Sequence, residues 1–260
     1  MKFYIRGGIG DLLQHYSFIK ENLDEEYLVH MHFKNAKTIF DQIGAFNCSF
    51  YEFQNADSLN QQTNSIINQF IGIDENKIFQ TPRNFYSNFD FGFQSNIKAE
   101  KLINSFKTKK KIIGIHPFRS GFALSVYSNF DLPAKIIPLS ITKEIISDDN
   151  NYLVFGSKKE LYDYGLEESD NIKLVSFDNI FDSLNTVKYC NKLIGVDSCF
   201  KSMSSMQKIH TICLIGDFPD QTRDEYFIKK YEQDKIMKVF KTKNEIEDSN
   251  KIIEFFKLNT

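Results

Sequence analysis

Apolar runs of strand length alternate with helix-length segments along most of this sequence, and this alternation constrains the fold more than any other feature. In the first part of the chain the runs lie at 2–6, 27–31 and 48–53, and segments 11–22 and 34–44 between them have helical spacing. Nearly continuous apolar strands joined by helices are typical of parallel sheets that helices cover on both faces.

A second series of the same kind follows the polar stretch 104–111. Its strands are predicted at 111–116, 151–156, 171–177, 191–197 and 210–217, and its helices at 158–164, 180–189 and 200–208. Two series predict an α/β protein with two Rossmann-like parallel-sheet domains facing a cleft. We expect an N-terminal domain at 1–106, a C-terminal domain at 107–243 and a closing helix within 244–260, for which packing back on the N-terminal domain is left open.

Composition excludes several classes of protein. The 260 residues are 42% hydrophobic and 25% charged, values of a globular chain, and the net charge of −2 argues against a general nucleic-acid binder. The basic run KTKKK at 107–111 is interpreted as a solvated hinge. No apolar stretch approaches the roughly 20 residues that span a bilayer, and no signal-peptide pattern is present.

The scattered cysteines and histidines give no sign of a metal centre. Cys48, Cys190, Cys199 and Cys213 lack CxxC pairing, so we expect reduced thiols in a cytoplasmic protein. The histidines at 30 and 32 have no cysteine or carboxylate partner at ligand spacing, so no zinc site is predicted. Peripheral membrane contact stays open.

The opening stretch GGIGDLL places glycines and an acid between a strand and a helix. Gly8 and Gly10 let a ligand approach the backbone, and Asp11 lies at the helix start. The spacing is not that of a dinucleotide-binding GxGxxG, so a NAD site is not expected. Asp11 is interpreted as an N-cap or first-turn acid of the helix, a role compatible with that of a functional carboxylate at the rim where α/β folds bind ligands. His15, one turn later, is expected to be a partly exposed helix residue that can also line an acceptor site.

Three strand ends in the second half carry small or polar residues. They are GIHPFRSG at 114–121, YLVFGSKKE at 152–160 and LIGVDSCFKS at 193–202. Carboxyl ends of parallel strands meet at one edge of a sheet, which makes the three stretches a candidate site. His116 is interpreted as a buried, backbone-bonded histidine, and Cys199 at a helix start is expected to have a lowered thiol pKa while serving mainly in packing.

In this order the motifs resemble glycosyltransferase family nine, the heptosyltransferase family of GT-B fold. The resemblance covers most of the chain through GGIGDLLQ, IHPFRS, FGSKKE and GVDSCFKSMSSMQKIHTICLIGD. It implies inverting transfer of a sugar, usually from ADP-heptose, with a nucleotide-diphosphate sugar as donor substrate, no bound metal and no other cofactor.

The resemblance also implies roles for individual residues. Asp11 matches the family's catalytic base, and Arg119 and Ser120 fall in the loop that contacts the donor phosphates. Glu160, after the turn at Gly156, matches the acid that binds the ribose. Asp197 and Ser198 match the turn that cradles the diphosphate.

This turn departs from the family pattern. Cys199 replaces the family's glycine, and Ser202 stands where a histidine is expected. Lys201 either supplies the lost positive contact or is a solvated helix residue.

The expected function is therefore transfer of a sugar to a hydroxyl of a glycan or lipopolysaccharide. A DNA or protein glycosyltransferase of phage type is an alternative, in which DNA would be the acceptor despite the net acidity. Two further alternatives remain: a catalytically silent nucleotide-sugar-binding protein, and a GT-B-fold epimerase or hydrolase.

Overall fold

The fold was analysed in a computed structural model. It describes residues 2–31, 37, 40–41, 44–45, 47–52, 79–80, 97–118, 136–216, 237–244 and 246–260. The chain divides into two compact units, and the described elements up to residue 80 belong to the first and those from residue 97 onward to the second. None of the helices in these ranges has the length and apolarity needed to cross a membrane.

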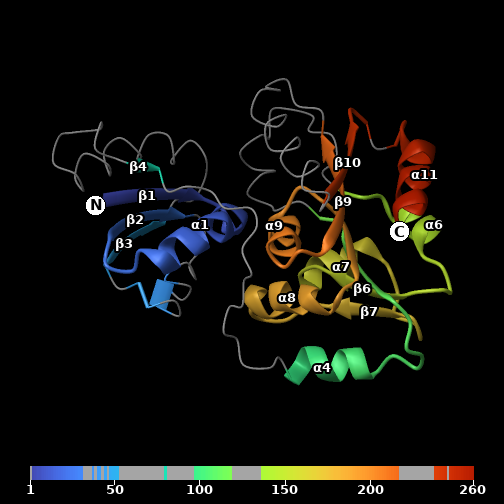
Figure 1. The fold of residues 1–260 in the computed structure, drawn as a ribbon. Coiled ribbons are helices and arrows are strands. Elements are labelled where there is room, and N and C mark those ends of the chain that lie inside the picture. Colours follow the sequence, from blue (N-terminus) through green and yellow to red (C-terminus); the bar gives the residue numbers. More distant parts are fainter. Residues whose placement is uncertain are drawn as a thin grey trace. The chain divides into compact units, whose positions relative to one another are not determined.

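The first unit is a parallel sheet with a helix after its first strand (Figure 1). Its elements are β1 (Lys2–Gly7), α1 (Ile9–Glu21), β2 (Glu26–Met31), β3 (Cys48–Glu52) and β4 (Phe79–Gln80). The strand order is β3-β2-β1-β4, and β1 pairs with β2 in a register that places Ile5 opposite Val29. Leu12, Leu13 and Ile19 of α1 are buried, because apolar residues at helical spacing form one face that packs on the sheet.

The second unit is a six-stranded parallel sheet with helices between its strands. Its elements are α4 (Ile97–Asn104), β5 (Ile112–His116), α6 (Leu139–Ile145), β6 (Asn151–Phe155), α7 (Lys158–Tyr164), β7 (Ile172–Val175), α8 (Ile180–Thr186), the 3₁₀ helix η2 (Val187–Tyr189), β8 (Lys192–Val196), α9 (Cys199–Met206), β9 (His210–Gly216), β10 (Met237–Thr242) and α11 (Ser249–Asn259). Read across the sheet, the order is β7-β6-β5-β8-β9-β10. This is the strand order of a Rossmann fold, because the chain moves outward from β5 to one edge and then returns to the other side of β5.

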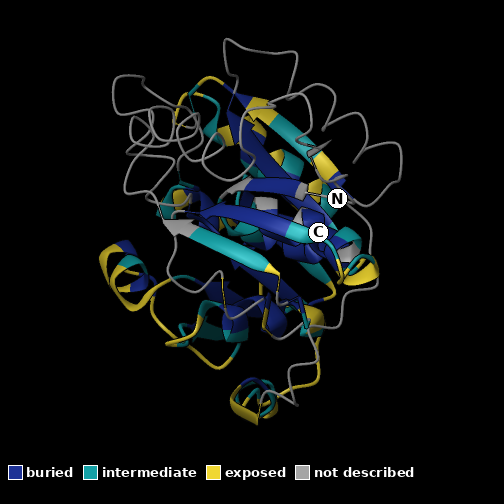
Figure 2. Cartoon of the chain, turned by 90° about the vertical axis from the view of Figure 1, so that its left-hand side faces the viewer, coloured by how far each residue is buried: buried dark blue, intermediate teal, exposed yellow. Residues whose placement is uncertain are grey.

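Helices cover both faces of the second sheet. In Figure 1, α8 and α9 lie on one side of it, and α6 and α11 lie on the other. One core cluster joins strand residues such as Ile113 and Val154 to Ile141 of α6 and Phe256 of α11. The inner strands β5, β6, β8 and β9 are almost entirely buried, whereas the edge strand β10 has exposed residues at Lys238 and Lys241 (Figure 2). The continuous apolar strand pattern thus has its expected cause, since both faces of the sheet are covered.

Local capping chemistry fixes the ends of α7. Ser157 Oγ accepts a hydrogen bond from the backbone N–H of Glu160 at 3.2 Å, and Glu160 Oε2 accepts one from the N–H of Ser157 at 2.8 Å. This is a capping box, which satisfies two N–H groups that the helix leaves unpaired. At the other end, Gly165 has a φ of 73°, a left-handed conformation that favours glycine.

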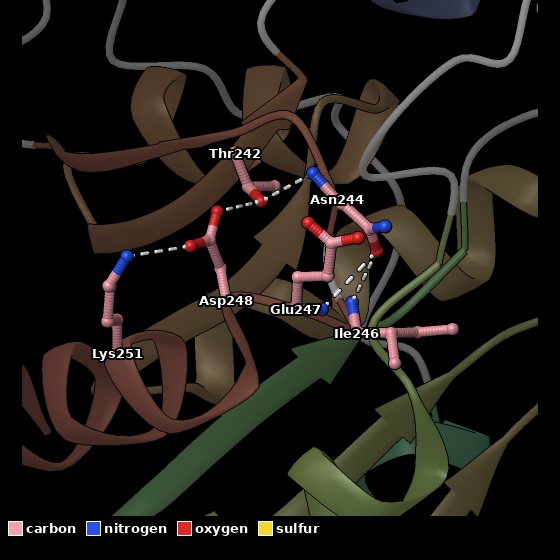
Figure 3. A network of polar contacts seen from close by, with 6 residues as sticks. All are labelled: Thr242, Asn244, Ile246, Glu247, Asp248 and Lys251. Carbon is pink, nitrogen blue, oxygen red and sulfur yellow. Dashed lines mark hydrogen bonds and ion pairs between the residues drawn. The ribbon is translucent and has the colours of Figure 1, made fainter.

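A compact polar network connects β10 to α11 (Figure 3). Asn244 Oδ1 accepts hydrogen bonds from the N–H of Ile246 at 3.0 Å and of Glu247 at 3.4 Å. Thr242 donates to Asp248 Oδ2 at 2.8 Å, and Lys251 pairs with Asp248 Oδ1 at 3.0 Å. The turn and the first turn of α11 therefore form one hydrogen-bonded unit.

Every strand expected from the sequence is present, but several other expectations differ from the structure. The run 107–111 is exposed, yet it lies within the second unit, where Lys107 pairs with Asp170 at 2.7 Å. It is therefore not a hinge between units. The sequence reading missed four described elements: β4, β10, α4 and α6. Of these, α4 belongs to the second unit although its residues fall before the boundary expected at 106. The C-terminal helix packs within the second unit, since Ile252 and Phe256 belong to its core.

Candidate functional site

The strand order of the second sheet locates a candidate ligand site. β5 lies between β6 and β8, so the direction in which the chain crosses the sheet reverses between β5 and β8. In open parallel sheets, ligands bind outside the carboxyl ends of the strands at such a reversal. The two strand ends at this point are His116 of β5 and Val196 of β8, which is followed by the turn Asp197–Ser198.

A hydrogen bond joins the two strand ends. His116 Nδ1 lies 3.0 Å from Ser198 Oγ, although the two residues are 82 positions apart in the chain. His116 pairs in register with Gly195 of β8. A Cβ atom on Gly195 would lie 3.0 Å from the carbonyl oxygen of His116, so glycine allows the two strands to end this close together.

The imidazole of His116 is enclosed by aromatic rings. Phe200 of α9 stacks on it with ring centroids 4.1 Å apart, and Phe118 meets it edge-on at 6.1 Å. His116 is 7% exposed, and this burial lowers its pKa from 6.5 to about 3, because the charged form loses its hydration. The ring is therefore neutral at physiological pH. His116 is buried as expected, but its Nδ1 lies at hydrogen-bonding distance from the Ser198 side chain, where a backbone partner was expected.

The turn before α9 carries an internal ion pair. Lys201 Nζ pairs with Asp197 Oδ1, four residues earlier, and only 11% of the Lys201 side chain is exposed. Lys201 is thus not a solvated helix residue. It forms a mostly buried cation next to the helix start, with Asp197 as its partner.

Burial determines whether the Cys199 thiol is protonated. Its sulfur lies at the first residue of α9, where the N–H groups of Cys199 and Phe200 lower the thiol pKa. Burial outweighs them and raises the pKa to about 12. The lowered thiol pKa expected from the helix start is therefore wrong. Loss of hydration destabilises the thiolate more than the N–H groups at the helix start stabilise it.

Gly156 and Glu160 follow the neighbouring strand β6. A Cβ on Gly156 would lie 2.7 Å from the Phe118 ring, so a larger residue would displace that ring. The Glu160 carboxylate forms the capping box of α7 through Oε2. A ribose-binding role would have to be combined with this structural one.

In the first unit, the helix after β1 carries the other predicted residues. α1 begins at Ile9, so Gly8 precedes the helix and Gly10 lies within its first turn. Asp11 is the third residue of α1 and therefore a first-turn acid, not the N-cap itself. His15, expected to be partly exposed, is buried at 5% exposure because it lies among the buried residues of α1.

Arg119 and Ser120 lie outside the described residues. All four cysteines are free thiols. Within the described ranges, no group of three or more histidine, cysteine, aspartate or glutamate side chains is placed to hold a metal ion.

The link between His116 and Ser198 is the feature that sequence reasoning missed. The signal available in the sequence was a histidine at a strand end, directly before Pro117. That signal does not reveal the partner, since strand order alone decides which turn lies beside it.

Comparison with known proteins bears on the fold. No protein-family model matches the sequence, nor does any curated protein. Among solved structures, the chain is similar to ADP-heptose lipopolysaccharide heptosyltransferase II of Escherichia coli, with a TM-score of 0.51 and 12% identity over 98% of this chain and 99% of that one. A family 9 glycosyl transferase from Veillonella parvula matches with a TM-score of 0.49 and 12% identity, over 100% of this chain and 97% of that one. The predicted fold class is confirmed: the chain has two parallel-sheet units and a heptosyltransferase-like fold.

Proposed function

We propose that this protein is a glycosyltransferase that moves a sugar from a nucleotide-diphosphate donor to an acceptor hydroxyl. The observation that carries the proposal is the chain reversal between β5 and β8, where a Rossmann-type sheet presents the turn Asp197–Ser198 and the start of α9. Support also comes from the full-length fold similarity to a heptosyltransferase that uses ADP-heptose. An ADP-heptose-like sugar is thus a rational first donor to test.

In this proposal the second unit binds the donor. The first turn of α9 offers backbone N–H groups, and an anion is stabilised at such a helix start. Lys201 adds a nearby cation, although its ion pair with Asp197 offsets part of that charge. Together these groups would stabilise the negative charge that develops on the departing nucleoside diphosphate.

The first unit supplies the base. Asp11 would remove the proton of the acceptor hydroxyl, whose oxygen attacks the anomeric carbon as the bond to the diphosphate breaks. Attack opposite to the leaving group inverts the anomeric configuration. A carboxylate can act in this way when loss of water around it raises its pKa.

A screen of thermal stability with ADP-, GDP-, UDP-, CMP- and dTDP-sugars tests the proposal first. We expect one nucleoside-diphosphate sugar to raise the melting temperature, and release of its nucleoside diphosphate to depend on an added acceptor, with the CMP-sugar as the monophosphate control. The product should have inverted anomeric configuration by NMR. If no nucleotide sugar stabilises the protein, the proposal is contradicted. Free sugar released without any acceptor would indicate an epimerase or hydrolase instead.

One observation favours a second candidate, a nucleotide-sugar-binding protein without catalytic activity. Cys199 stands at the start of α9, and the neighbouring Lys201 already has Asp197 as an ion-pair partner. Donor binding without transfer to any glycan, protein or DNA acceptor would support this candidate.

A further inference from the structure

His116 is a buried polar side chain that the proposed reaction does not use. It lies at the end of β5, and its Nδ1 is 3.0 Å from the hydroxyl of Ser198. We propose that His116 is a positioning residue of the donor site, which holds the Ser198 hydroxyl away from the first turn of α9 and so keeps that turn open to the donor's diphosphate. This inference rests on the proposed function.

Ser198 is a helix N-cap whose side chain does not cap the helix. A serine in this position ordinarily accepts a hydrogen bond from the backbone N–H of the second or third helical residue, here Phe200 or Lys201. Ser198 has the extended backbone typical of a cap, with φ −153° and ψ 175°, yet its side chain makes no capping hydrogen bond. The hydroxyl is directed to His116 instead.

The ring of His116 is fixed strongly enough to hold this hydroxyl. Phe200 stacks on one face, Phe118 packs edge-on, and close pairing with Gly195 fixes the backbone. Because burial lowers the pKa of His116 to about 3, the ring adds no positive charge to the site near neutral pH. Its effect on an anion is therefore exerted through Ser198 and not through its own charge.

The thiol of Cys199 also contacts this turn, since the N–H groups of Cys199 and Phe200 form hydrogen bonds to its sulfur, but it is a weak competitor. Burial raises its pKa to about 12, so the sulfur remains protonated, and a thiol sulfur accepts hydrogen bonds poorly. A hydroxyl oxygen at the N-cap position is a stronger acceptor for such N–H groups than a thiol sulfur. Holding that hydroxyl on His116 therefore removes the main intramolecular competitor of a phosphate oxygen.

A double-mutant cycle tests this arrangement. His116→Phe keeps an aromatic ring against Phe200 but removes Nδ1, so the freed Ser198 hydroxyl should turn to cap α9. Two ligands are measured: pyrophosphate, and the nucleoside diphosphate that binds best among ADP, GDP, UDP, CDP and dTDP. We expect the affinity for each to fall by about fivefold, which corresponds to the free energy of one capping hydrogen bond. Adding Ser198→Ala should restore much of the lost affinity, because the competing hydroxyl is then gone. Calorimetry measures binding, and thermal unfolding checks the fold of each variant.

Rescue by the second substitution is the decisive result, since a merely structural role of His116 would not produce it. If the double variant binds as weakly as His116→Phe, the inference is overturned while the proposed function stands. His116→Asn, which keeps a hydrogen-bonding group near the place of Nδ1, should bind close to wild type, and its failure to do so in a folded protein would also overturn the inference. A wild-type protein that binds none of these ligands would contradict the proposed function itself.

Discussion

The four strands of the first sheet have the same order as the first four strands of the second, but the residues that follow the central strands differ. In the first unit, β1 leads through Gly8 directly into α1, and an acid, Asp11, lies in the first turn of that helix. In the second unit, β5 occupies the position that β1 has in the first, and it ends at His116. The helix at the chain reversal there is α9, which follows β8. The first unit therefore has an acid in the first turn of the helix after its central strand, whereas the second has a histidine at the end of the corresponding strand. The proposed function assigns different roles to these two helix starts, and the predictions below test each assignment.

The largest expected effect tests whether His116 is neutral in the folded protein. Its pKa is lowered from 6.5 to about 3, so the unfolded chain binds a proton in this range and the folded one does not. Stability should therefore be lost as pH falls from 6.5 towards 3, by up to about 4–5 kcal/mol from this group.

Urea unfolding at a series of pH values measures this loss. His116→Asn, which cannot titrate here, isolates it from the carboxylates, and its stability should fall less steeply over the same range. Parallel curves for the two proteins would show that folding does not lower the pKa of His116.

The next effect concerns the base of the first unit. Asp11→Asn keeps the shape of the side chain, so stability should change by only a few tenths of a kcal/mol. Sugar transfer should fall by roughly a hundredfold or more, while donor affinity is maintained. Asp182→Asn, which removes a first-turn acid from α8, is the matched control and should leave the rate near wild type. If the Asp11→Asn variant transfers sugar at the normal rate, Asp11 has only a structural role, and His15 becomes the next candidate for the base.

Glu160 tests whether a capping residue also binds the donor. Glu160→Ala should weaken binding of the nucleotide sugar by roughly 1–3 kcal/mol if the carboxylate holds the ribose. Ser157→Ala breaks the same capping box but keeps the carboxylate, so it separates the two roles. Calorimetry that gives equal losses for both variants would assign Glu160 to the helix alone.

The smallest effect is expected from the cation beside α9. Lys201→Met should weaken binding of the nucleoside diphosphate by about 1 kcal/mol and of the bare nucleoside by less. Lys159→Met is the control, because Lys159 also pairs four residues along its helix, with Asp163, but is largely exposed. Arg119→Met belongs in the same series. Equal losses for both ligands would mean that Lys201 acts only through the fold.

Local patterns in the sequence determined much of this protein. The apolar strands, the helix starts after them and the Ser157–Glu160 capping box depend on neighbouring residues, so spacing alone predicts them. The strand β4, which was not predicted, has only two residues and therefore too few for a clear period.

Only the tertiary structure decided what meets at the chain reversal. Strand order places His116 beside Ser198 across 82 positions, and no local pattern encodes which strands become neighbours. Burial then reversed the expected state of Cys199 and lowered the pKa of His116, because hydration of a charge is lost according to what packs around it. The sequence specified the elements, while contacts between distant segments specified the environment of the groups that carry the chemistry.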